Sequence, residues 1–487
     1  MELITRGTPR RSTEMAGLAK TFTIDTEVAP ADLNDLLQFI YHHYLLTHPT
    51  FFKNIKRATF DHERMLYFTN IGPDGKWRID AEIRGRKPLL VKMTPSSKIV
   101  PQSAIDQLKE DLVIWVQLFE DKIRTTTLYF AWIKGEKIIP ETMPSRHKRT
   151  TVNLFTVNII LFYLIFIGVS ILLFSLLGFY APIAIIAAQF LTVLFSDKII
   201  MQFGKLKIDS KNKEVYLLQY HLPIKEYQEF RKKYGEDMIL RMKQEIYEKT
   251  LAIGKEPSCA VGEKIFAKYS MKCIPERMMT KKVDVYGIVK KVADKFHLPT
   301  PKIVISNSMV PNAAATGPSP SHGAVLITTG LLAQLEDDEI YSVIGHEFGH
   351  LKGRDPLILF GLASAEYLLR LYVFLPFFLY APLLYLMITM GVIYFIAKFF
   401  EARADLQSAI VIGQPQILAE SLRKIGYRHL QFEKAPAYKL QSWLNWDPHP
   451  PIYFRVSRLE KLKTPVKVEH PLVQSVKDVI NGFRAAL

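Results

Sequence analysis

A stretch of 46 residues without a charged side chain, from Thr151 to Ser196, sets the strongest limit on how this chain folds. One membrane-spanning helix needs about 20 apolar residues, so the stretch has room for two helices and a turn. Gly178 to Pro182 supply the turn, because glycine and proline interrupt helices. We therefore predict a transmembrane hairpin over residues 151–197.

Basic residues flank this hairpin on both sides. The segment SRHKRT at 145–150 precedes it and three lysines follow it closely, whereas the turn between the helices has no basic residue. Positive charge marks the cytoplasmic side of a membrane protein, so both flanks are expected in the cytoplasm. The chain also opens on Glu2 without an apolar segment, which does not fit a cleavable signal peptide. The N-terminus is therefore expected to be cytoplasmic.

A second apolar region covers residues 357–398 and includes 27 consecutive uncharged residues. Glu366 and Arg370 lie inside it, four residues apart on one helix face, where they can pair and lower the cost of burial. Pro376 and Pro382 mark a turn. We predict a second hairpin here, either fully spanning or re-entrant.

The soluble segments divide into an N-terminal α+β domain over residues 1–148 and a charged helical connector over 205–281. In the N-terminal domain the patterns predict helices over 31–48 and 103–123, with strands between them and a closing strand over 125–133. This domain shows no catalytic constellation. It is either a structural domain or a module that recruits a partner.

The two cysteines, Cys259 and Cys273, lie in the connector. Without further cysteines they fit neither a disulfide framework nor a cysteine zinc cluster, and we expect two free thiols in a reducing compartment. The formal charge of +16 suits nucleic acid or the anionic face of a bilayer. The apolar hairpins favour the bilayer, and the chain contains no nucleic-acid recognition motif.

The segment EDDEIYSVIGHEFGHLKGRD, residues 336–355, contains the pattern His-Glu-x-x-His at His346, Glu347 and His350. On a helix, four residues correspond to about 40° of rotation and about 6 Å of rise, so both histidines can reach one ion. Glu347 is then placed as the general base that takes a proton from the attacking water. The alternative is an amphipathic helix with two surface histidines.

Gly345 and Gly349 lie within the same predicted helix, at a cost of about 1 kcal/mol each in helix propensity. We interpret them as positions where a substrate or a neighbouring element comes close to the helix backbone. Around the motif, residues 282–355 and 399–487 together form the predicted domain that carries the metal site.

A catalytic zinc site takes three protein ligands and keeps one position open. The segment KFFEARADLQSAI supplies a candidate third ligand, Glu401, and places Asp405 on the same helix face. Asp405 would accept a hydrogen bond from the far nitrogen of a ligating histidine. If Glu401 meets His346 at one ion, both ends of the second hairpin lie on one side of the membrane, and the chain crosses it four times. The alternative is that both acids are ordinary surface residues.

Four segments in order, HEFGHLKGRD, the second hairpin, EARAD and DPHPPIYFRVSRL, closely resemble the HtpX-like membrane metalloproteases, gluzincins related to the CaaX prenyl proteases. The resemblance covers roughly Lys282–Leu462 and the first hairpin, and leaves the first 150 residues outside. It implies a mainly α fold with small β elements: four transmembrane helices, a gluzincin-type α+β protease domain and an extra N-terminal domain. It also implies one zinc ion per chain, an active site facing the cytoplasm, and protein or peptide substrates, chiefly membrane proteins.

Carried over by position, the zinc ligands fall on His346, His350 and Glu401, and the general base falls on Glu347. The resemblance further implies that Asn312 and Ala313 belong to an edge strand that holds the substrate backbone.

His449 and Arg455 correspond to residues near the metal, where a donor or a cation could stabilise an oxyanion. Without the family, His449 fits a turn and Arg455 a surface charge.

Two other functions remain open. A CaaX-type prenyl-protein protease is one, although such a chain would resemble a protein with seven spans and we count four. A non-catalytic membrane scaffold stabilised by zinc is the other, and Glu347 argues against it because a structural site needs no base. The sequence does not indicate an oligomeric state.

Overall fold

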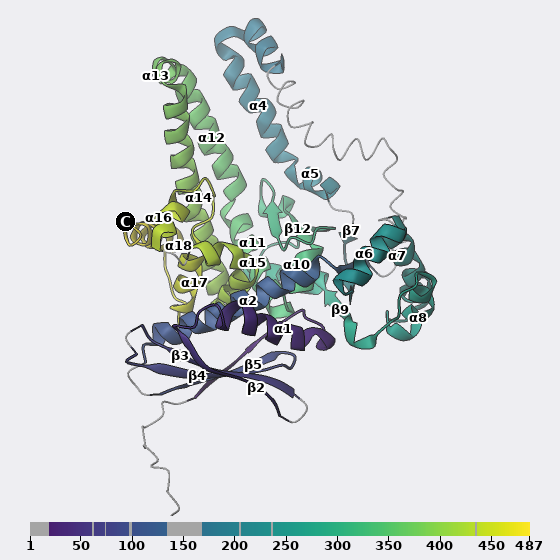
Figure 1. Ribbon diagram of the computed structural model, residues 1–487. Helices are drawn as coiled ribbons and strands as arrows, with labels where there is room; N and C mark the ends of the chain where they lie inside the picture. The colour runs from purple at the N-terminus through teal and green to yellow at the C-terminus, as the bar shows by residue number, and fades with distance from the viewer. Residues whose placement is uncertain are drawn as a thin grey trace, which may run out of the picture. The chain divides into compact units, whose positions relative to one another are not determined.

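The computed structural model describes residues 19–60, 63–73, 75–96, 100–133, 168–203, 206–234, 237–433 and 436–487. The described residues are mainly helical, with three small sheets, and the chain divides into two compact units, Met1–Thr127 and Leu128–Leu487 (Figure 1). The first unit is shorter than the expected domain 1–148.

The first unit is an antiparallel sheet in the order β1-β5-β4-β3-β2, with two helices on one face (Figure 1). Its strands are β1 (Lys20–Ile24), β2 (Phe52–Phe60), β3 (Glu63–Ile71), β4 (Arg78–Arg84) and β5 (Leu89–Pro95), and its helices are α1 (Leu33–Ile40) and α2 (Gln102–Arg124). The strands alternate between buried apolar and more exposed residues, as expected when one face of a sheet packs against helices. In β4, Ile79, Ala81 and Ile83 are buried while the residues between them are more exposed. The predicted helices and strands of this region are therefore present.

The sequence suggested that the strand over 125–133 closes the N-terminal domain, and this prediction is wrong. The strand, β6 (Thr127–Ile133), belongs to the second unit. It lies beside β8 (Glu214–His221), which pairs with β9 (Met278–Asp284), in a three-stranded sheet of the second unit. Helices α6 (Ile224–Tyr234), α7 (Asp237–Lys249) and α8 (Cys259–Lys268) follow β8. The predicted connector is thus helical only in part.

Cys259 and Cys273 form a disulfide, so the prediction of two free thiols is wrong. Cys259 begins α8, and the chain turns back after this helix, which brings the two Cα atoms to 5.9 Å. That separation lies within the range a disulfide can bridge. Sequence spacing alone did not reveal the return of the chain.

The region predicted to carry the metal site is built around a four-stranded sheet, in the order β11-β12-β10-β7. Its strands are β7 (Leu206–Ile208), β10 (Lys302–Ser306), β11 (Ala313–Thr316) and β12 (Ala324–Thr328). Helices α9 (Val285–Phe296), α10 (Thr329–Gln334) and α11 (Asp337–Gly353) share one hydrophobic core with the sheet. β11 lies at the edge of the sheet, as expected for the segment that follows Asn312.

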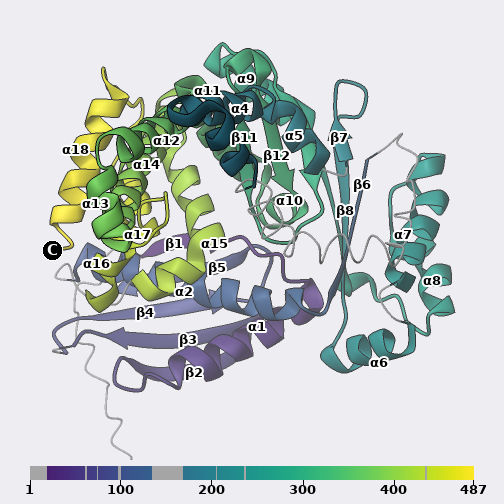
Figure 2. The same cartoon turned by 90° about the horizontal axis from the view of Figure 1, so that it is seen from above.

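The second apolar region forms a hairpin. Helix α12 (Asp355–Tyr372) and helix α14 (Pro382–Ile412) lie side by side in both views and are joined by the short helix α13 (Leu375–Tyr380) (Figures 1 and 2). Glu366 and Arg370 form the predicted pair, with 3.5 Å between Oε2 and an Nη atom. The sequence placed a boundary at residue 398, whereas α14 continues without interruption to Ile412.

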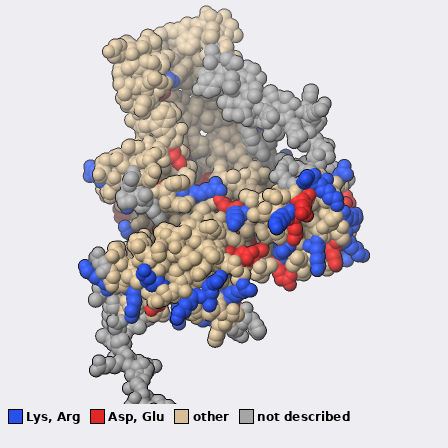
Figure 3. Space-filling model, viewed as in Figure 1, with Lys and Arg blue, Asp and Glu red and all other residues tan. Residues whose placement is uncertain are grey.

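Two helices in the described residues are long and apolar enough to cross a membrane, Gly168–Leu194 and Pro382–Ile412. The first contains the predicted turn, because Gly178–Tyr180 forms a 3₁₀ turn before α4 (Ala181–Leu194). Most of the first arm of that hairpin, residues 151–167, lies outside the described residues. On the face seen in Figure 3, the end of the hairpin around α13 has almost no charged side chains.

The C-terminal part adds helices that pack beside α14. They are α15 (Pro415–Glu433), α16 (Pro436–Leu444), α17 (Ile452–Glu460) and α18 (Pro471–Arg484).

Candidate metal centre

Helix α11 positions the motif. A capping box between Glu336 and Glu339 starts the helix, and acidic residues fill its first turn, where the helix dipole favours negative charge. The helix ends at Arg354 in the left-handed conformation, with φ of 55°, and the Arg354 N–H bonds back to carbonyls of the last turn. His346 and Glu347 are buried in the middle of this helix.

The two glycines of α11 let α14 approach closely. A Cβ atom on Gly349 would lie 2.8 Å from the Cα atom of Ala404, and one on Gly345 would lie 2.6 Å from the side chain of Ile412. Both neighbours belong to α14. The interpretation of these glycines as close-approach positions is therefore confirmed.

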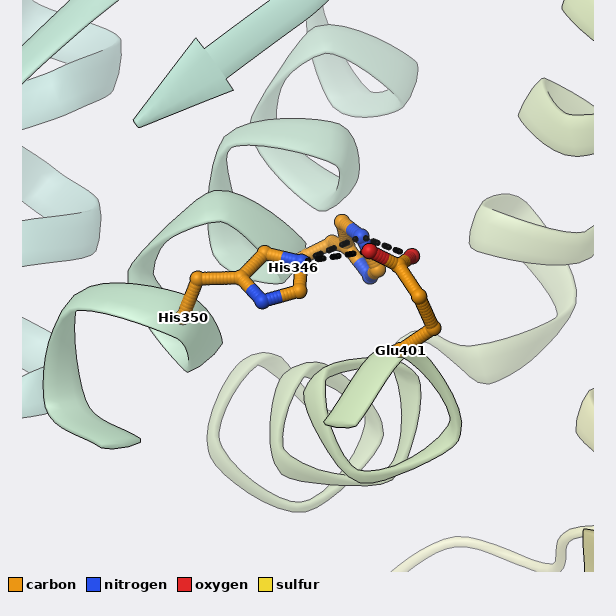
Figure 4. Close-up of side chains that lie close together, drawn as sticks. All are labelled: His346, His350 and Glu401. Atoms are coloured by element: carbon orange, nitrogen blue, oxygen red, sulfur yellow. Dashed lines mark hydrogen bonds and ion pairs between the residues drawn. The ribbon is translucent and has the colours of Figure 1, made fainter. Parts of the chain in front are cut away.

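The close approach brings Glu401 to the two histidines (Figure 4). The Nε2 atoms of His346 and His350 lie 3.1 Å apart and point toward the carboxylate. His346 Nε2 is 3.4 Å from Glu401 Oε2, and His350 Nε2 is 3.3 Å from Glu401 Oε1. Three residues from two helices, 55 positions apart at the extremes, thus converge on one point.

Asp405 lies behind His346, as the sequence predicted for a residue of this spacing. Its Oδ1 is 2.9 Å from His346 Nδ1, and its side chain is fully buried. Burial alone would lower the pKa of His346, but Asp405 and Glu401 outweigh it and raise that pKa to about 10 in the absence of a metal. The same negative charge favours a bound cation.

The sequence did not single out Asp355, which lies behind His350 at a Nδ1–Oδ2 distance of 2.7 Å. Arg403 donates to the other oxygen of Asp355 and also contacts the carbonyl of Gly349, 3.4 Å away. Each histidine therefore has a carboxylate within 3 Å of Nδ1, although only the contact of His350 with Asp355 has normal hydrogen-bond geometry. In both residues Nε2 is the nitrogen that faces the cluster. The only available signal was an acid five residues after His350.

Glu347 lies beside the cluster and contacts the edge strand. Its Oε2 accepts a hydrogen bond of 2.8 Å from the N–H of Ala315 in β11. Burial raises the pKa of Glu347, and the neighbouring histidines only partly offset this. Ala313 is the first residue of β11, and Asn312 precedes it, with its N–H bonded to Thr328 Oγ1 at 2.9 Å. The structure thus places the edge strand next to the acid of the motif.

His449 and Arg455 also reach the cluster, in different ways. His449 Nε2 is 3.7 Å from Glu401 Oε1, and half of the His449 side chain is exposed. Arg455 is buried, and it donates two hydrogen bonds to Asp405, of 2.8 and 2.7 Å. It is therefore not a surface charge, and its main contact is with Asp405.

The arrangement fits a metal ion. Tetrahedral zinc with bonds of about 2.0–2.1 Å to nitrogen holds neighbouring ligand atoms about 3.3 Å apart, close to the separations between these side chains. Glu401 Oε2 is buried and has no hydrogen bond of normal geometry among the described residues. The nearest donors, His346 Nε2 at 3.4 Å and Arg455 Nη1 at 3.8 Å, are too distant or poorly aligned for a normal hydrogen bond, and a cation at this point would give the buried oxygen a closer partner.

Comparisons with known proteins agree with this chemistry. Residues 280–463 match the sequence pattern of Peptidase family M48. A "Protease HtpX homolog" from Thermodesulfovibrio yellowstonii is 31% identical over 234 residues, which cover 41% of this chain and 80% of that protein. Another, from Methanopyrus kandleri, is 33% identical over 213 residues, 37% of this chain and 66% of that protein.

Among solved structures, the crystal structure of S. mikatae Ste24p matches with a TM-score of 0.39 and 13% identity over 73% of each chain. The sequence matches are sufficient: with the family pattern over the ligand cluster and a relative covered along four fifths of its length, the chain belongs to the HtpX-like metalloproteases of peptidase family M48.

Proposed function

We propose that this protein is a zinc endopeptidase of the membrane, which hydrolyses peptide bonds in membrane or misfolded proteins. The observation that carries the proposal is the placement of Glu347, buried between the ligand cluster and the edge strand β11. His346, His350 and Glu401 would hold one zinc ion, which supplies a Lewis acid and lowers the pKa of water. The protein residues do the rest of the chemistry.

Glu347 acts as the general base. Burial raises its pKa above the ordinary value of a glutamate, which makes it a stronger base, and the Ala315 N–H fixes one of its oxygens. A substrate that pairs with β11 as an added strand lies beside Glu347, because β11 itself contacts that carboxylate. Main-chain pairing of this kind, at Asn312 and Ala313 onward, reads the substrate backbone more than its side chains. His449, half exposed beside Glu401, would donate to the oxyanion.

Arg455 and Asp405 act behind the ligands. We expect Asp405 to orient His346, and Arg455 to neutralise Asp405 and not to touch the substrate, since both of its short contacts are to that acid.

We also propose four membrane crossings with the active site and the N-terminus in the cytoplasm. The pairing of α12 with α14 and the return of α14 to α11 support an even number of crossings in the second hairpin. The basic flanks of the first hairpin support the orientation. The two cysteines do not support a cytoplasmic location, because they form a disulfide and disulfides are more common in oxidising compartments. Reporter fusions after residue 148 and after residue 487 test the orientation, and an enzymatically active periplasmic or luminal reporter at either site would overturn it.

Replacement Glu347→Gln tests the proposed reaction. The variant keeps the size of the side chain and leaves the ligands intact, so purified protein should retain one zinc per chain but lose cleavage of casein and of a membrane protein. Asp338→Asn, which changes an exposed acid on the same helix, serves as the matched control and should cleave as the wild type does.

The outcomes separate the alternatives. Cleavage by Glu347→Gln would refute Glu347 as the base. Cleavage of a farnesylated peptide, with no cleavage of casein, would favour the prenyl protease. Zinc-loaded wild type that cleaves nothing would favour the scaffold.

A further inference from the structure

Lys398 is a buried lysine in α14, three residues before Glu401. Only 1% of its surface is exposed, although a lysine is costly to bury unless its donors are satisfied. Its Nζ donates to the backbone carbonyl of Asp447 and to that of His449, the latter at 3.3 Å. Both acceptors belong to the short loop before α17, which carries His449.

A second residue of this loop, Asp447, contacts both the backbone and the imidazole of His449. Asp447 Oδ1 accepts from the His449 N–H at 2.9 Å and lies 2.7 Å from His449 Nδ1. Proline at positions 448, 450 and 451 restricts φ on either side of His449. Because Nδ1 contacts Asp447, the other ring nitrogen, Nε2, faces Glu401, with 3.7 Å between Nε2 and Oε1.

We propose that Lys398 is a positioning residue: by binding the two carbonyls of the loop, it places His449 Nε2 beside the metal site, where His449 donates to the developing oxyanion. This inference rests on the proposed peptidase function. Because Lys398 and Glu401 are on one face of one helix, the same rigid element sets both the ligand and the donor.

The geometry favours this over a purely structural tie. A tie between α14 and the loop could attach at any residue of the loop, yet Lys398 bonds the carbonyl of His449 itself and the residue whose carboxylate orients the ring. Loss of Lys398 therefore frees the backbone at the point where a small rotation moves Nε2 away from the substrate.

Lys398→Met keeps the side-chain length and apolar stem but removes the donors. We expect it to retain one zinc per chain with unchanged chelator competition, to lower kcat at least about tenfold, and to leave KM nearly unchanged. His449→Ala should lower kcat about 100-fold, as loss of one oxyanion donor does. The double variant should be no slower than His449→Ala, because Lys398 acts only through His449.

Lys424→Met is the control for burial. Lys424 is also a buried lysine, paired with Glu339 at 2.7 Å at the start of α11, and its loss should reduce stability while kcat per bound zinc stays at the wild-type value.

Full kcat per bound zinc in Lys398→Met would overturn the inference, as would additive losses in the double variant. If the wild-type protein cleaves no peptide, the proposed function itself is wrong. That result differs from full kcat in Lys398→Met and from additive losses in the double variant, which contradict only the role of Lys398. If Lys398→Met does not fold, Lys398→Arg, which keeps donors at the same position, should recover zinc and part of kcat. A folded Lys398→Arg with no more activity than His449→Ala would also contradict the proposal.

Discussion

The close contact at Gly349 makes the substitution Gly349→Ala a sensitive test of the candidate metal centre. The added Cβ would lie 2.8 Å from Ala404 Cα and 3.0 Å from the Ala404 carbonyl oxygen, distances that real Cβ atoms essentially do not show. Both neighbours are main-chain or Cα atoms of α14, so no side chain can rotate away. The two helices have to separate by about 0.6 Å before the shortest contact reaches an ordinary 3.4 Å.

Two opposing terms decide the stability of this variant. Alanine gains about 1 kcal/mol of helix propensity over glycine, and overpacking costs about 1–3 kcal/mol. The net change is a loss of about 2 kcal/mol or less, so the protein should still fold. The metal centre is less tolerant, because a site keeps its ligands to within about 0.2 Å. Glu401 lies one helical turn before Ala404 and moves with it, so zinc affinity should fall about 10- to 100-fold.

Competition between the purified protein and a chromophoric zinc chelator measures this loss. Gly361→Ala in α12 is the matched control, because its Cβ would meet no atom within 4 Å, and it should bind zinc as the wild type does. The zinc affinity of Gly345→Ala should lie between those of Gly349→Ala and Gly361→Ala, because the atoms near its added Cβ are side-chain atoms of Ile412 and Ser408 that can shift. Wild-type zinc affinity in Gly349→Ala would show that the separation of α11 and α14 does not control the site.

Three further predictions concern the surroundings of the cluster. Asp405→Asn removes the charge between His346 and Arg455, so zinc affinity should fall about 10- to 100-fold in the same chelator competition. Asp478→Asn is the control: it removes the charge of the partly exposed partner of Arg458 and should leave zinc affinity unchanged. Removal of zinc with a chelator should abolish cleavage and lower the unfolding temperature, because a ligand that binds only the folded state stabilises it, and added zinc should restore both; equal unfolding temperatures with and without metal would contradict the assignment. Alkylation of the denatured, unreduced protein should label neither Cys259 nor Cys273, and labelling of either would contradict the disulfide.

Local pattern was enough to predict the centre of the candidate site. The histidine pair lies four residues apart on one helix, and Glu401 and Asp405 repeat that spacing on another, so each half could be recognised without knowledge of the fold. The glycines of α11 then indicated that something packs closely against the helix. Only the pairing of the two halves needed a long-range argument, which the apolar hairpin between them supplied.

Features that depend on distant pairing could not be predicted in the same way. β8 is a buried strand in a charged region, and its neighbours β6 and β9 lie about 80 and 60 residues away in the chain. The Cys259–Cys273 disulfide depends on the turn after α8, and a single pair of cysteines has no pattern that distinguishes a bridge from two thiols. Arg455 was expected near the metal, but only the fold shows that Asp405 occupies its guanidinium.

The second hairpin links the apolar segment to the chemistry at both of its ends. α12 begins at Asp355, the acid that contacts His350, and α14 carries Lys398, Glu401 and Asp405 after about four turns of exposed apolar surface. Neither helix has a break between its apolar part and these residues, so a tilt or shift of the hairpin moves an acceptor of one histidine together with the third candidate ligand. The packing of α11 against α14 at Gly349 limits that movement on the protease side, and α13 joins the two helices at the other end. The geometry of the candidate metal centre is therefore set jointly by the protease core and by the surroundings of the hairpin, and a fragment without residues 357–398 would lose the element that holds Glu401 opposite His346.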